Sequence, residues 1–328
     1  MGEHLQPLVS VVTPVFNGEK YLAECIESVL AQTYENWEYV IVDNCSTDRT
    51  MEIAQMYQRR DARIHVNENR EFLPHISNWN RALRQITTDC KYCKVVHADD
   101  QLFPDCLTRM VEVAEANPSV GIVGAYRLDG KAISLDGFPS DRTVVSGREI
   151  CRSSLLGGPY VFGTPTSLLI ASDVIRSREA FYNESILHAD SEACYDVLRT
   201  SDFAFVHEVL TYTRRHDRSV THRHRSLDTL VLDRFLRLRR YGPEYLSEEE
   251  YRYTLKRNTT RYYRFLTQQL LQGKLDVWRY HRRGLEQSGV SLSASYLAEG
   301  FAWLLIRRLL DAARTLKAAL KRVALSKG

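Results

Sequence analysis

The first half of the chain alternates between short apolar runs and segments whose apolar residues recur at helical spacing. Between Tyr21 and Leu30 the apolar residues return every three or four positions, which is typical of a helix with one buried face. The pattern predicts strands at residues 8–12, 37–42, 62–66, 92–97 and 120–126, and helices that begin near residues 21, 48, 76 and 104.

Strands that alternate with helices predict an α/β domain with a doubly wound, mostly parallel sheet. In such sheets ligands bind at the carboxyl ends of the strands. Thr13-Pro14, Asp43 and Asp99-Asp100 all stand at predicted strand ends. We therefore expect these residues to lie along one edge of the sheet.

The pattern changes beyond residue 127. Residues 127–187 are less regular and contain GGPYVFGTPTS (157–167), a Gly- and Pro-rich loop. A helix is predicted at 191–200 and an extended segment at 203–206, and the chain beyond about residue 225 is predicted to be mainly helical.

Charge is distributed unevenly along the chain. Residues 1–220 carry 22 Lys or Arg and 31 Asp or Glu, a net charge of −9, whereas residues 221–328 carry 22 and 10, a net charge of +12. The two segments therefore favour different electrostatic partners.

Hydropathy and cysteine content indicate a cytoplasmic protein. No run approaches the roughly 20 apolar residues that span a bilayer, and no basic segment followed by an apolar one suggests a secretory signal. The seven cysteines lack the density of a disulfide framework. Cys90 and Cys93 form a lone CxxC, which we interpret as strand residues and not as a zinc site.

Acidic residues at strand ends suggest how a phosphate could be held. The sequence has no GxxxxGK[ST], no GxGxxG after the first strand, no HExxH and no GxSxG, so P-loop, dinucleotide and serine-hydrolase chemistry lack their usual motifs. A divalent cation bound by Asp99 and Asp100 could instead bridge to a diphosphate. Alternatively, these aspartates simply lead into the helix that Pro104 begins.

Several ordered motifs resemble those of the family 2 glycosyltransferases, which have the GT-A fold. Residues 14–50 resemble the family's opening, P-x-[YF]-N, then S-x-L-x-Q-T-Y, then V-D-[DN]-x-S-x-D. ADDQLFPD (98–105) resembles D-x-D-D-x-x-x-P. Later segments that resemble family motifs are GTPTS (163–167), HADSEACYDVL (188–198) and RRHDRSVT (214–221). The resemblance covers about residues 8–221.

The resemblance implies a Rossmann-like GT-A catalytic domain at 1–221 and a basic, mainly helical C-terminal extension at 222–328. It implies an inverting, metal-dependent transfer of a sugar from a nucleotide-diphospho sugar, with UDP as the expected nucleotide. The implied acceptor is a hydroxyl of a growing polysaccharide or of a lipid-linked glycan, in polysaccharide or cell-surface glycan synthesis.

The same resemblance assigns residues to the nucleotide. Thr13, Pro14 and Phe16 would line the base pocket, with Phe16 stacking on the nucleobase. Asp43 would accept hydrogen bonds from the base, and Asn80 would lie near the donor. The alternatives are a core aromatic for Phe16, a helix cap for Asp43 and a helix-surface residue for Asn80.

The resemblance also places a Mn²⁺ or Mg²⁺ site at the Asp-Asp segment. Asp99 would be the principal ligand and Asp100 a supporting one. His97 stands where the family has its first acid, so this sequence departs from the pattern. Its imidazole could bind a ribose hydroxyl or Mn²⁺, or serve only as a strand residue.

Asp190 is the expected general base, because an inverting transfer needs a carboxylate to take the proton of the acceptor hydroxyl. The residue before it is Ala189, where the family usually has Glu, and Glu192 is the alternative base. Asp190 could also cap the following helix. Arg214 and His216 would contact the diphosphate, unless they are ordinary surface cations.

The C-terminal segment predicts an amphipathic helix. One face carries Phe301, Leu305, Leu309, Ala312, Leu316, Leu320 and Val323, and another carries Arg307, Arg314 and Lys321. Such a helix suits an anionic membrane surface, which would place the protein peripherally on the inner face of a membrane. Packing on the catalytic domain or formation of a homo-oligomer is the alternative, and no nucleic-acid-binding module accompanies the charge.

Two other functions stay open from the sequence. A sugar-phosphate nucleotidyltransferase would usually show a Gly-rich, basic loop after the first strand, whereas TPVFNGEKY (13–21) has one glycine. A non-catalytic protein that binds sugar nucleotides or glycans is suggested by His97 and Ala189, which replace family acids.

Overall fold

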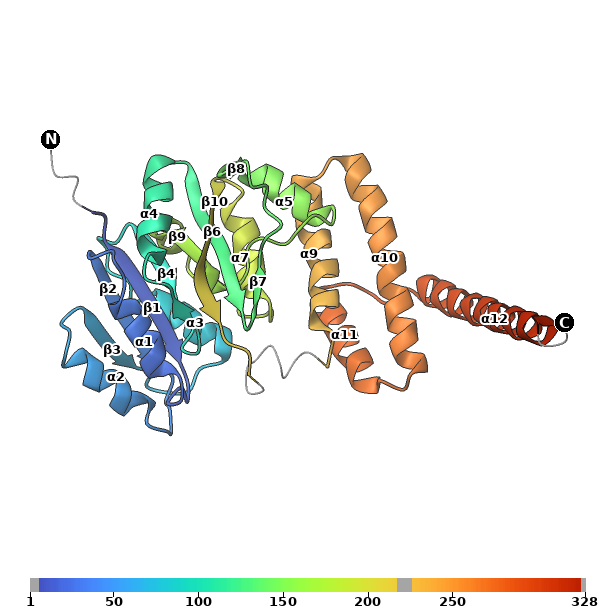
Figure 1. Ribbon diagram of the computed structural model, residues 1–328, viewed down its shortest axis with the longest axis horizontal. Helices are drawn as coiled ribbons and strands as arrows, with labels where there is room; N and C mark the ends of the chain where they lie inside the picture. Colours follow the sequence, from blue (N-terminus) through green and yellow to red (C-terminus); the bar gives the residue numbers. More distant parts are fainter. Residues whose placement is uncertain (1–5, 217–225, 326–328) are drawn as a thin grey trace. The chain divides into compact units, whose positions relative to one another are not determined.

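The computed structural model describes residues 6–216 and 226–325, with the side chains of the last helix described up to residue 315. The chain divides into two compact units, Met1–Arg215 and His216–Gly328. The predicted domain boundary between residues 221 and 222 lies outside the described residues. All strands that the structure describes belong to the first unit, and the described elements of the second are helices (Figure 1).

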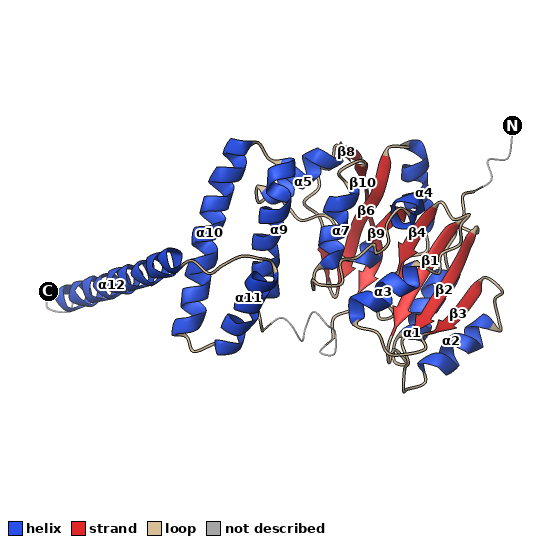
Figure 2. Cartoon of the chain, turned by 180° about the vertical axis from the view of Figure 1, so that it is seen from behind, coloured by secondary structure: helices blue, strands red, loops and turns tan. Residues whose placement is uncertain are grey.

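A ten-stranded sheet forms the centre of the first unit (Figure 2). Eight of its strands follow the order β3-β2-β1-β4-β9-β6-β10-β5, while β7 pairs with β6 and β8 with β10. Neighbours among β3, β2, β1 and β4 are parallel, as are β6 and β10. The strands are β1 (Val9–Val15), β2 (Trp37–Asp43), β3 (Ile64–Glu68), β4 (Tyr92–Val95), β5 (Gln101–Leu102), β6 (Val120–Asp129), β7 (Ala132–Ser134), β8 (Val144–Ser146), β9 (Leu168–Ala171) and β10 (Asp202–Thr213).

Helices cover both faces of this sheet, with α1, α2 and α4 on one face and α3 and α7 on the other (Figures 1 and 2). The backbone N–H of Leu107 in α4 donates to Gln32 Oε1 just after α1, which ties two helices of one face together. The helical elements are α1 (Leu22–Leu30), α2 (Thr50–Gln58), α3 (His75–Leu83), α4 (Cys106–Ala116), α5 (Gly147–Leu155), the 3₁₀ turn η1 (Pro165–Ser167), α6 (Ser172–Arg176) and α7 (Ala189–Val197).

The predicted α/β fold with a mostly parallel central sheet and C-terminal helices is confirmed. The five predicted strands correspond to β1, β2, β3, β4 and β6, and the extended segment at 203–206 is part of β10. The apparently irregular segment 127–187 contains elements that the pattern did not predict, above all β9. Strand β9 runs antiparallel between β4 and β6, in the middle of the sheet.

Four helices make up the described part of the second unit: α9 (Thr229–Tyr245), α10 (Glu248–Leu271), α11 (Leu275–Gln287) and α12 (Ala294–Leu325). Ser247 and Glu250 form a capping box that starts α10. The Phe235 and Tyr262 rings stack with centroids 4.4 Å apart, and the Tyr262 hydroxyl lies 3.0 Å from His281 Nδ1. Aromatic packing and this buried hydrogen bond therefore join α9, α10 and α11.

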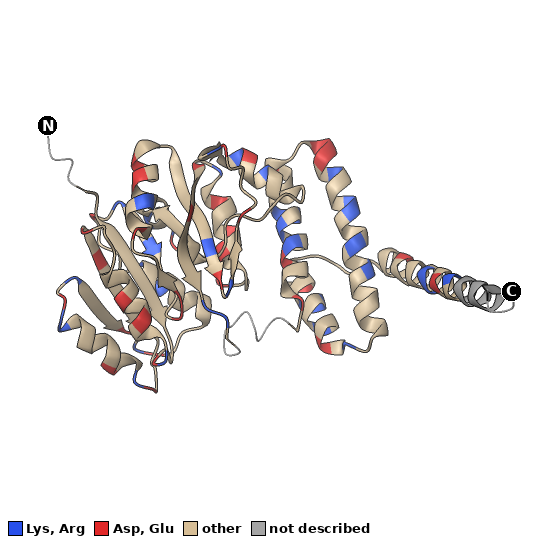
Figure 3. Cartoon of the chain, viewed as in Figure 1, with Lys and Arg blue, Asp and Glu red and all other residues tan. Residues whose placement is uncertain are grey.

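Charge and hydropathy agree with these elements. Figure 3 shows Lys and Arg positions spread along α9, α10 and α12. Within the described ranges, no helix combines the length and the apolar character that crossing a membrane requires. All seven cysteines are free thiols.

A lysine lies in the apolar core of the first unit. Every residue of β1 and β2 is buried, as expected for strands covered on both faces. Lys94 in β4 is fully buried, with its Nζ atom 3.4 Å from Met110 Sδ. Sulfur is a weak acceptor, so this contact replaces little of the lost hydration. Burial is the main cause of the lowered pKa of Lys94.

We expect Lys94→Met to raise the free energy of unfolding at pH 7 by about 1–3 kcal/mol, because it replaces a buried amine with an apolar chain of similar volume. The folded pKa of Lys94 is depressed, so the unfolded chain binds more protons and wild-type stability falls as the pH drops below the unfolded pKa of about 10.4. The gain should therefore be larger at pH 7 than at pH 10.

Urea unfolding followed by circular dichroism at both pH values measures this gain. Exposed Lys131→Met is the matched control and should change stability little. A loss of stability in Lys94→Met would show that the lysine is stabilising where it lies. A gain that does not depend on pH would show that the ionisation of the buried amine is not its cause.

Candidate active site

Several chain segments meet at the carboxyl edge of the sheet. Val15 at the end of β1 is in register with Asp43 at the end of β2, and β1 also pairs in parallel with β4. The backbone N–H of His97, two residues after β4, donates to Thr166 Oγ1 in η1 over 3.1 Å. The structure thus brings Asp43, His97 and the 165–167 turn to one edge.

Asp43 presents a buried acceptor at this edge. Its side chain is 1% exposed, and its Oδ2 atom accepts the backbone N–H of Ser46 over 2.9 Å. Its Oδ1 atom is buried and has no hydrogen-bond partner within the described residues. A buried acceptor without a protein donor is costly, so it suits a ligand that brings an N–H group.

Two exposed aromatic rings stand beside Asp43. Phe16 is 48% exposed and Phe72 58% exposed, and their ring centroids lie 4.9 Å apart with an interplanar angle of 67°. Asn44 connects them to the edge, since its N–H donates to Val15 and its side chain accepts the N–H of Leu73. Phe16 is therefore a surface aromatic and not a core residue, and Phe72 is a neighbour that the sequence pattern did not single out.

Thr13 and Pro14 lie near the end of β1. Both are buried, and Thr13 Oγ1 lies 2.8 Å from the Tyr39 hydroxyl and donates to the Val96 carbonyl over 2.8 Å. This bond links β1 to the chain that leaves β4. The two residues support the floor of the edge, and whether either one touches a nucleotide stays a prediction.

His97 is held against an indole ring. It stacks on Trp79 of α3 with centroids 4.8 Å apart and planes 30° apart. Burial is the main cause of its lowered pKa, and the nearby charges of Asp99 and Asp190 oppose that shift. The ring is therefore neutral near pH 7 and can donate or accept through Nε2, which is buried and has no partner in the described part of the chain.

The two adjacent aspartates have different environments. Asp100 is 2% exposed, whereas Asp99 is partly exposed. Burial, followed by the charge of Asp99, raises the pKa of Asp100 to about 7. Asp100 Oδ2 lies 3.8 Å from His97 Nδ1 and is buried without a hydrogen bond of normal geometry among the residues described, while the Thr166 hydroxyl lies near enough to oppose the rise of its pKa.

Arg214 anchors the Asp-Asp segment. Its backbone N–H donates to Asp100 Oδ1 over 3.1 Å, and its Nε–H donates to the Asp99 carbonyl over 3.2 Å. Its Nη2 atom lies 2.5 Å from Glu24 Oε2. These bonds occupy much of the guanidinium, so the predicted diphosphate contact would have to share it. His216 is the first residue of the second compact unit.

The residues at this edge suit a cation that takes some of its ligands from the protein and others from the phosphates of a substrate. In the described parts of the chain, no three His, Cys, Asp or Glu side chains gather as a complete metal site. His97 Nε2 and Asp100 Oδ2, next to Asp99, are nevertheless buried atoms that can coordinate a cation and that have no hydrogen-bond partner among the described residues. Mg²⁺ and Mn²⁺ sites of one or two carboxylates usually take their other ligands from phosphates and water.

Asp190 lies in the first turn of α7. Its Oδ1 atom accepts the backbone N–H of Ser191 over 2.8 Å, and the helix dipole favours a carboxylate there. The N-cap position belongs to His188, so Asp190 is not the cap. Glu192 is buried and accepts Asn183 Nδ2–H over 2.9 Å. Asp190 is thus the more accessible of the two carboxylates.

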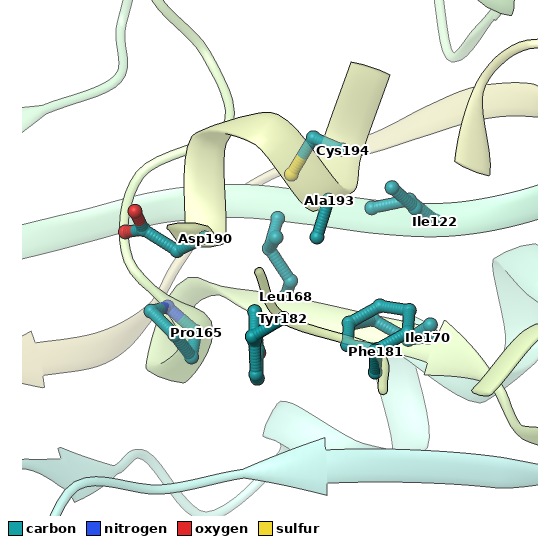
Figure 4. A pocket seen from close by; sticks show the side chains of 9 residues that line it. All are labelled: Ile122, Pro165, Leu168, Ile170, Phe181, Tyr182, Asp190, Ala193 and Cys194. Carbon is teal, nitrogen blue, oxygen red and sulfur yellow. The ribbon is translucent and has the colours of Figure 1, made fainter. Parts of the chain in front are cut away.

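A small pocket lies next to Asp190 (Figure 4). The other residues that line it are Ile122, Pro165, Leu168, Ile170, Phe181, Tyr182, Ala193 and Cys194. Figure 4 shows the Asp190 carboxylate at one end of the pocket, turned away from Ile170 and Phe181. The apolar lining supports the start of α7, while the carboxylate remains directed elsewhere.

Asn80 is buried and paired with the backbone. Its Nδ2–H donates to the Tyr182 carbonyl and its Oδ1 atom accepts the Tyr182 N–H, both over 2.8 Å. It is therefore not a helix-surface residue. These two bonds hold the segment that leads to Asp190, and contact of Asn80 with a donor stays a prediction.

Comparisons with known proteins agree on one family. The profile described as "Glycosyl transferase family 2" matches residues 10–176. A Bacillus subtilis protein named as a teichuronic acid biosynthesis glycosyltransferase, TuaG, is 34% identical over 139 residues, which are 42% of this chain and 53% of TuaG. Glycosyltransferase GlyG of Streptococcus pneumoniae is 30% identical over 124 residues, 37% of this chain and 40% of GlyG. The chain thus spans about half the length of these relatives, or less.

Solved structures share the fold. The crystal structure of S. aureus TarS 1–349 in complex with UDP-GlcNAc has a TM-score of 0.61 at 16% identity and covers 86% of this chain and 81% of that one. The mannosyltransferase PcManGT from Pyrobaculum calidifontis, in complex with GDP-Man and Mn²⁺, has a TM-score of 0.56 at 15% identity and covers 92% and 81%. At such identities the likeness concerns the fold alone.

We expect Asn80→Ala to act through structure. The change leaves the Tyr182 N–H and C=O unpaired in a buried site, which should lower the free energy of unfolding by about 2–4 kcal/mol. Amide hydrogen exchange of residues 181–190 should rise more than that of β1 and β2.

Ser77→Ala is the matched control, because Ser77 lies in the same helix and its exposed hydroxyl bonds Glu184. Weaker nucleotide binding in Asn80→Ala, with unchanged stability and exchange, would contradict the structural role and favour direct contact with a donor.

Proposed function

Because the chain belongs to glycosyl transferase family 2, we propose that it is an inverting glycosyltransferase that uses a nucleotide-diphospho sugar, with UDP as the nucleotide. The observation that carries the proposal is the convergence of Asp43, His97 and the 165–167 turn at one sheet edge, with Asp190 near enough for its charge to act on His97 and in the same pocket lining as Pro165. The acceptor is a hydroxyl of a polysaccharide or a lipid-linked glycan, which the name of TuaG supports.

The nucleotide would bind beside β1 and β2. Phe16 and Phe72 offer aromatic surface for the base, and Asp43 Oδ1 offers an acceptor for its N–H. TarS was solved with a UDP-sugar and PcManGT with a GDP-sugar, so the choice of base is a matter for direct measurement.

Asp99, with Asp100 and His97, would hold Mn²⁺ or Mg²⁺ together with the diphosphate. When bound, the cation neutralises charge that develops on the departing diphosphate. His97 differs from the acid of the family pattern, because a neutral imidazole adds a ligand without adding negative charge. It would thereby tune the metal site, with a greater affinity for Mn²⁺ than for Mg²⁺.

Asp190 would act as the general base. The acceptor oxygen attacks the anomeric carbon from the face opposite the leaving group and forms the new C–O bond. The acceptor proton passes to the carboxylate, and the bond between the anomeric carbon and the diphosphate oxygen breaks with its electron pair. Glu192 is already bonded to Asn183 in a buried site, which makes it the less suitable base.

The last helix supports a proposal about location. Helix α12 packs on α10, where the Tyr296 and Tyr263 rings stack, and beyond the buried Leu304 its described side chains are exposed. Leu305 is 62% and Leu309 62% exposed on one face, and Arg307 and Arg314 lie on another. We propose that this helix lies on an anionic membrane surface at the cytoplasmic side, near a lipid-linked acceptor. The predicted positions Leu316, Leu320, Lys321 and Val323 have side chains outside the described residues.

We expect UDP-sugars to raise the melting temperature of the full chain in the presence of Mn²⁺, and GDP- or dTDP-sugars to raise it less.

Asp99→Ala should lower kcat/KM by at least 100-fold, since it removes the main metal ligand. Asp190→Asn should lower kcat by about 100- to 10,000-fold and leave the affinity for UDP unchanged.

The panel of nucleotide sugars and the steady-state rates check these expectations, with Asp105→Asn as a control outside the site. Nucleotide binding without turnover on any glycan acceptor would favour a non-catalytic binding protein. Release of pyrophosphate from a nucleoside triphosphate and a sugar phosphate would favour a nucleotidyltransferase.

The membrane proposal predicts co-sedimentation of the full chain with vesicles of phosphatidylcholine and phosphatidylglycerol. Replacing Leu305 and Leu309 by Glu should reduce the bound fraction at least tenfold, because it removes buried apolar area and adds like charge. Replacing Arg307 and Arg314 by Gln should weaken binding by about 1 kcal/mol per residue, and salt should do the same.

Leu271→Glu is the matched control, since Leu271 is also exposed but ends α10. Equal sedimentation of wild type and the Leu305/Leu309 variant would reject the proposal. A change from dimer to monomer in that variant, measured by light scattering, would indicate an interface between copies of the chain.

A further inference from the structure

Buried polar atoms without partners gather near the Asp-Asp segment. Folded proteins leave few such atoms, so a cluster indicates a surface that faces a ligand or water. Beyond Asp43 Oδ1, those on elements at or beside the carboxyl edge, among the described residues, are His97 Nε2, Asp100 Oδ2, Arg127 Nη1, Thr164 Oγ1, Ser167 Oγ, Thr211 Oγ1 and Thr213 Oγ1. Only one of these atoms belongs to a permanent cation, the guanidinium of Arg127.

Arg127 is fixed in place but not fully paired. Its side chain is 13% exposed, its Nε–H donates to Ser134 Oγ over 3.0 Å, and its Nη2–H donates to Asp129 Oδ2 over 3.2 Å. Asp129 also pairs with Arg215 through both of its oxygens. Two guanidinium groups thus share one carboxylate, which leaves a net positive charge and an unpaired Nη1 group.

The strand register places Arg127 opposite the predicted metal segment. Thr211 of β10 is in register with Arg127 of β6 on one side and with Leu102 of β5 on the other. Two strand spacings amount to roughly 10 Å, and Asp100 is two residues before Leu102. The charge of Arg127 reaches the predicted metal segment. It is among the causes that lower the pKa of Asp100 and of His97, although burial is the largest cause of both shifts.

We propose that Arg127 binds the diphosphate of the sugar donor through Nη1 and stabilises it as the leaving group. The inference rests on the proposed glycosyl transfer. As the anomeric C–O bond breaks, its electron pair passes to the β-phosphate oxygen, and an N–H of a fixed guanidinium is a strong donor to the charge that forms. Because His97 contributes no negative charge to metal binding, a protein cation would stabilise the diphosphate together with the metal ion.

The experiment measures nucleotide binding to the full chain by calorimetry, with UDP and UMP as probes, in Mn²⁺ and in EDTA. Arg127→Gln should weaken UDP binding in EDTA by about 10- to 100-fold, the range of a charge-assisted hydrogen bond. UMP, which lacks the β-phosphate, should bind within threefold of wild type. The UDP affinity of Arg127→Lys should lie between those of wild type and Arg127→Gln, since lysine keeps the positive charge and loses the planar pair of N–H donors.

Arg109→Gln is the matched control, because Arg109 pairs with an exposed carboxylate, Glu208, away from this edge. Circular dichroism checks that each variant is folded, and if Arg127→Gln does not fold, Arg127→Lys carries the test through its UDP and UMP affinities. UDP affinity within twofold of wild type in a folded Arg127 variant would overturn the inference and leave the proposed function standing. A wild-type chain that binds UDP and transfers no sugar would overturn the proposed function alone. A wild-type chain that binds neither UDP, GDP nor dTDP would overturn both.

Discussion

The parallel pairing of β2, β1 and β4 determines where every polar group of the candidate site can lie. Parallel strands end at the same edge, so Val15, Asp43 and His97 leave the sheet side by side. The strands themselves are buried on both faces, and polar residues within them, such as Glu38 and Lys94, are buried as well. Polar side chains that can reach a ligand therefore lie at or beyond the strand ends, where backbone and ligand compete for their hydrogen bonds.

That constraint has an energetic consequence. Asp43, Asp100, His97 and Arg127 each bury a polar atom without a partner among the described residues, and each such atom opposes folding. The surrounding structure compensates through bonds that fix the same side chains, such as those from Ser46 to Asp43 and from Arg214 to Asp100. Positions held this firmly are prepared for a ligand before it arrives, which lowers the cost of binding it.

The fold could be predicted from the sequence where strands and helices alternate regularly. Strands β1, β2, β4 and β6 could be predicted because each is an apolar run followed or preceded by a helix with one apolar face. Strand β9 could not, because four residues in a Gly- and Pro-rich region carry no period, and its antiparallel pairing depends on residues distant in sequence. Its position nevertheless decides the site, since it brings η1 to His97.

The site residues divide in the same way. Asp43 and Asp99 could be found from their places at strand ends, and Asp190 from its motif. Arg127 stands one residue beyond the predicted strand at 120–126, so the same rule of strand ends could have found it, although β6 itself continues to Asp129. Trp79 and Phe72 gave no such signal, because their importance comes from rings that meet only in the folded chain.

The charges near the Asp-Asp segment explain how an imidazole can stand in place of an acid. A third carboxylate would add negative charge beside Asp99 and Asp100, where burial and the charge of Asp99 already raise the pKa of Asp100 to about 7. A neutral His97 stacked on Trp79 avoids that repulsion and still presents a donor atom. The cost is a weaker attraction for a cation, and the net positive group of Arg127, Asp129 and Arg215 lies where it can hold a phosphate directly. On this account the replacement of the acid and the buried arginine belong to one electrostatic arrangement.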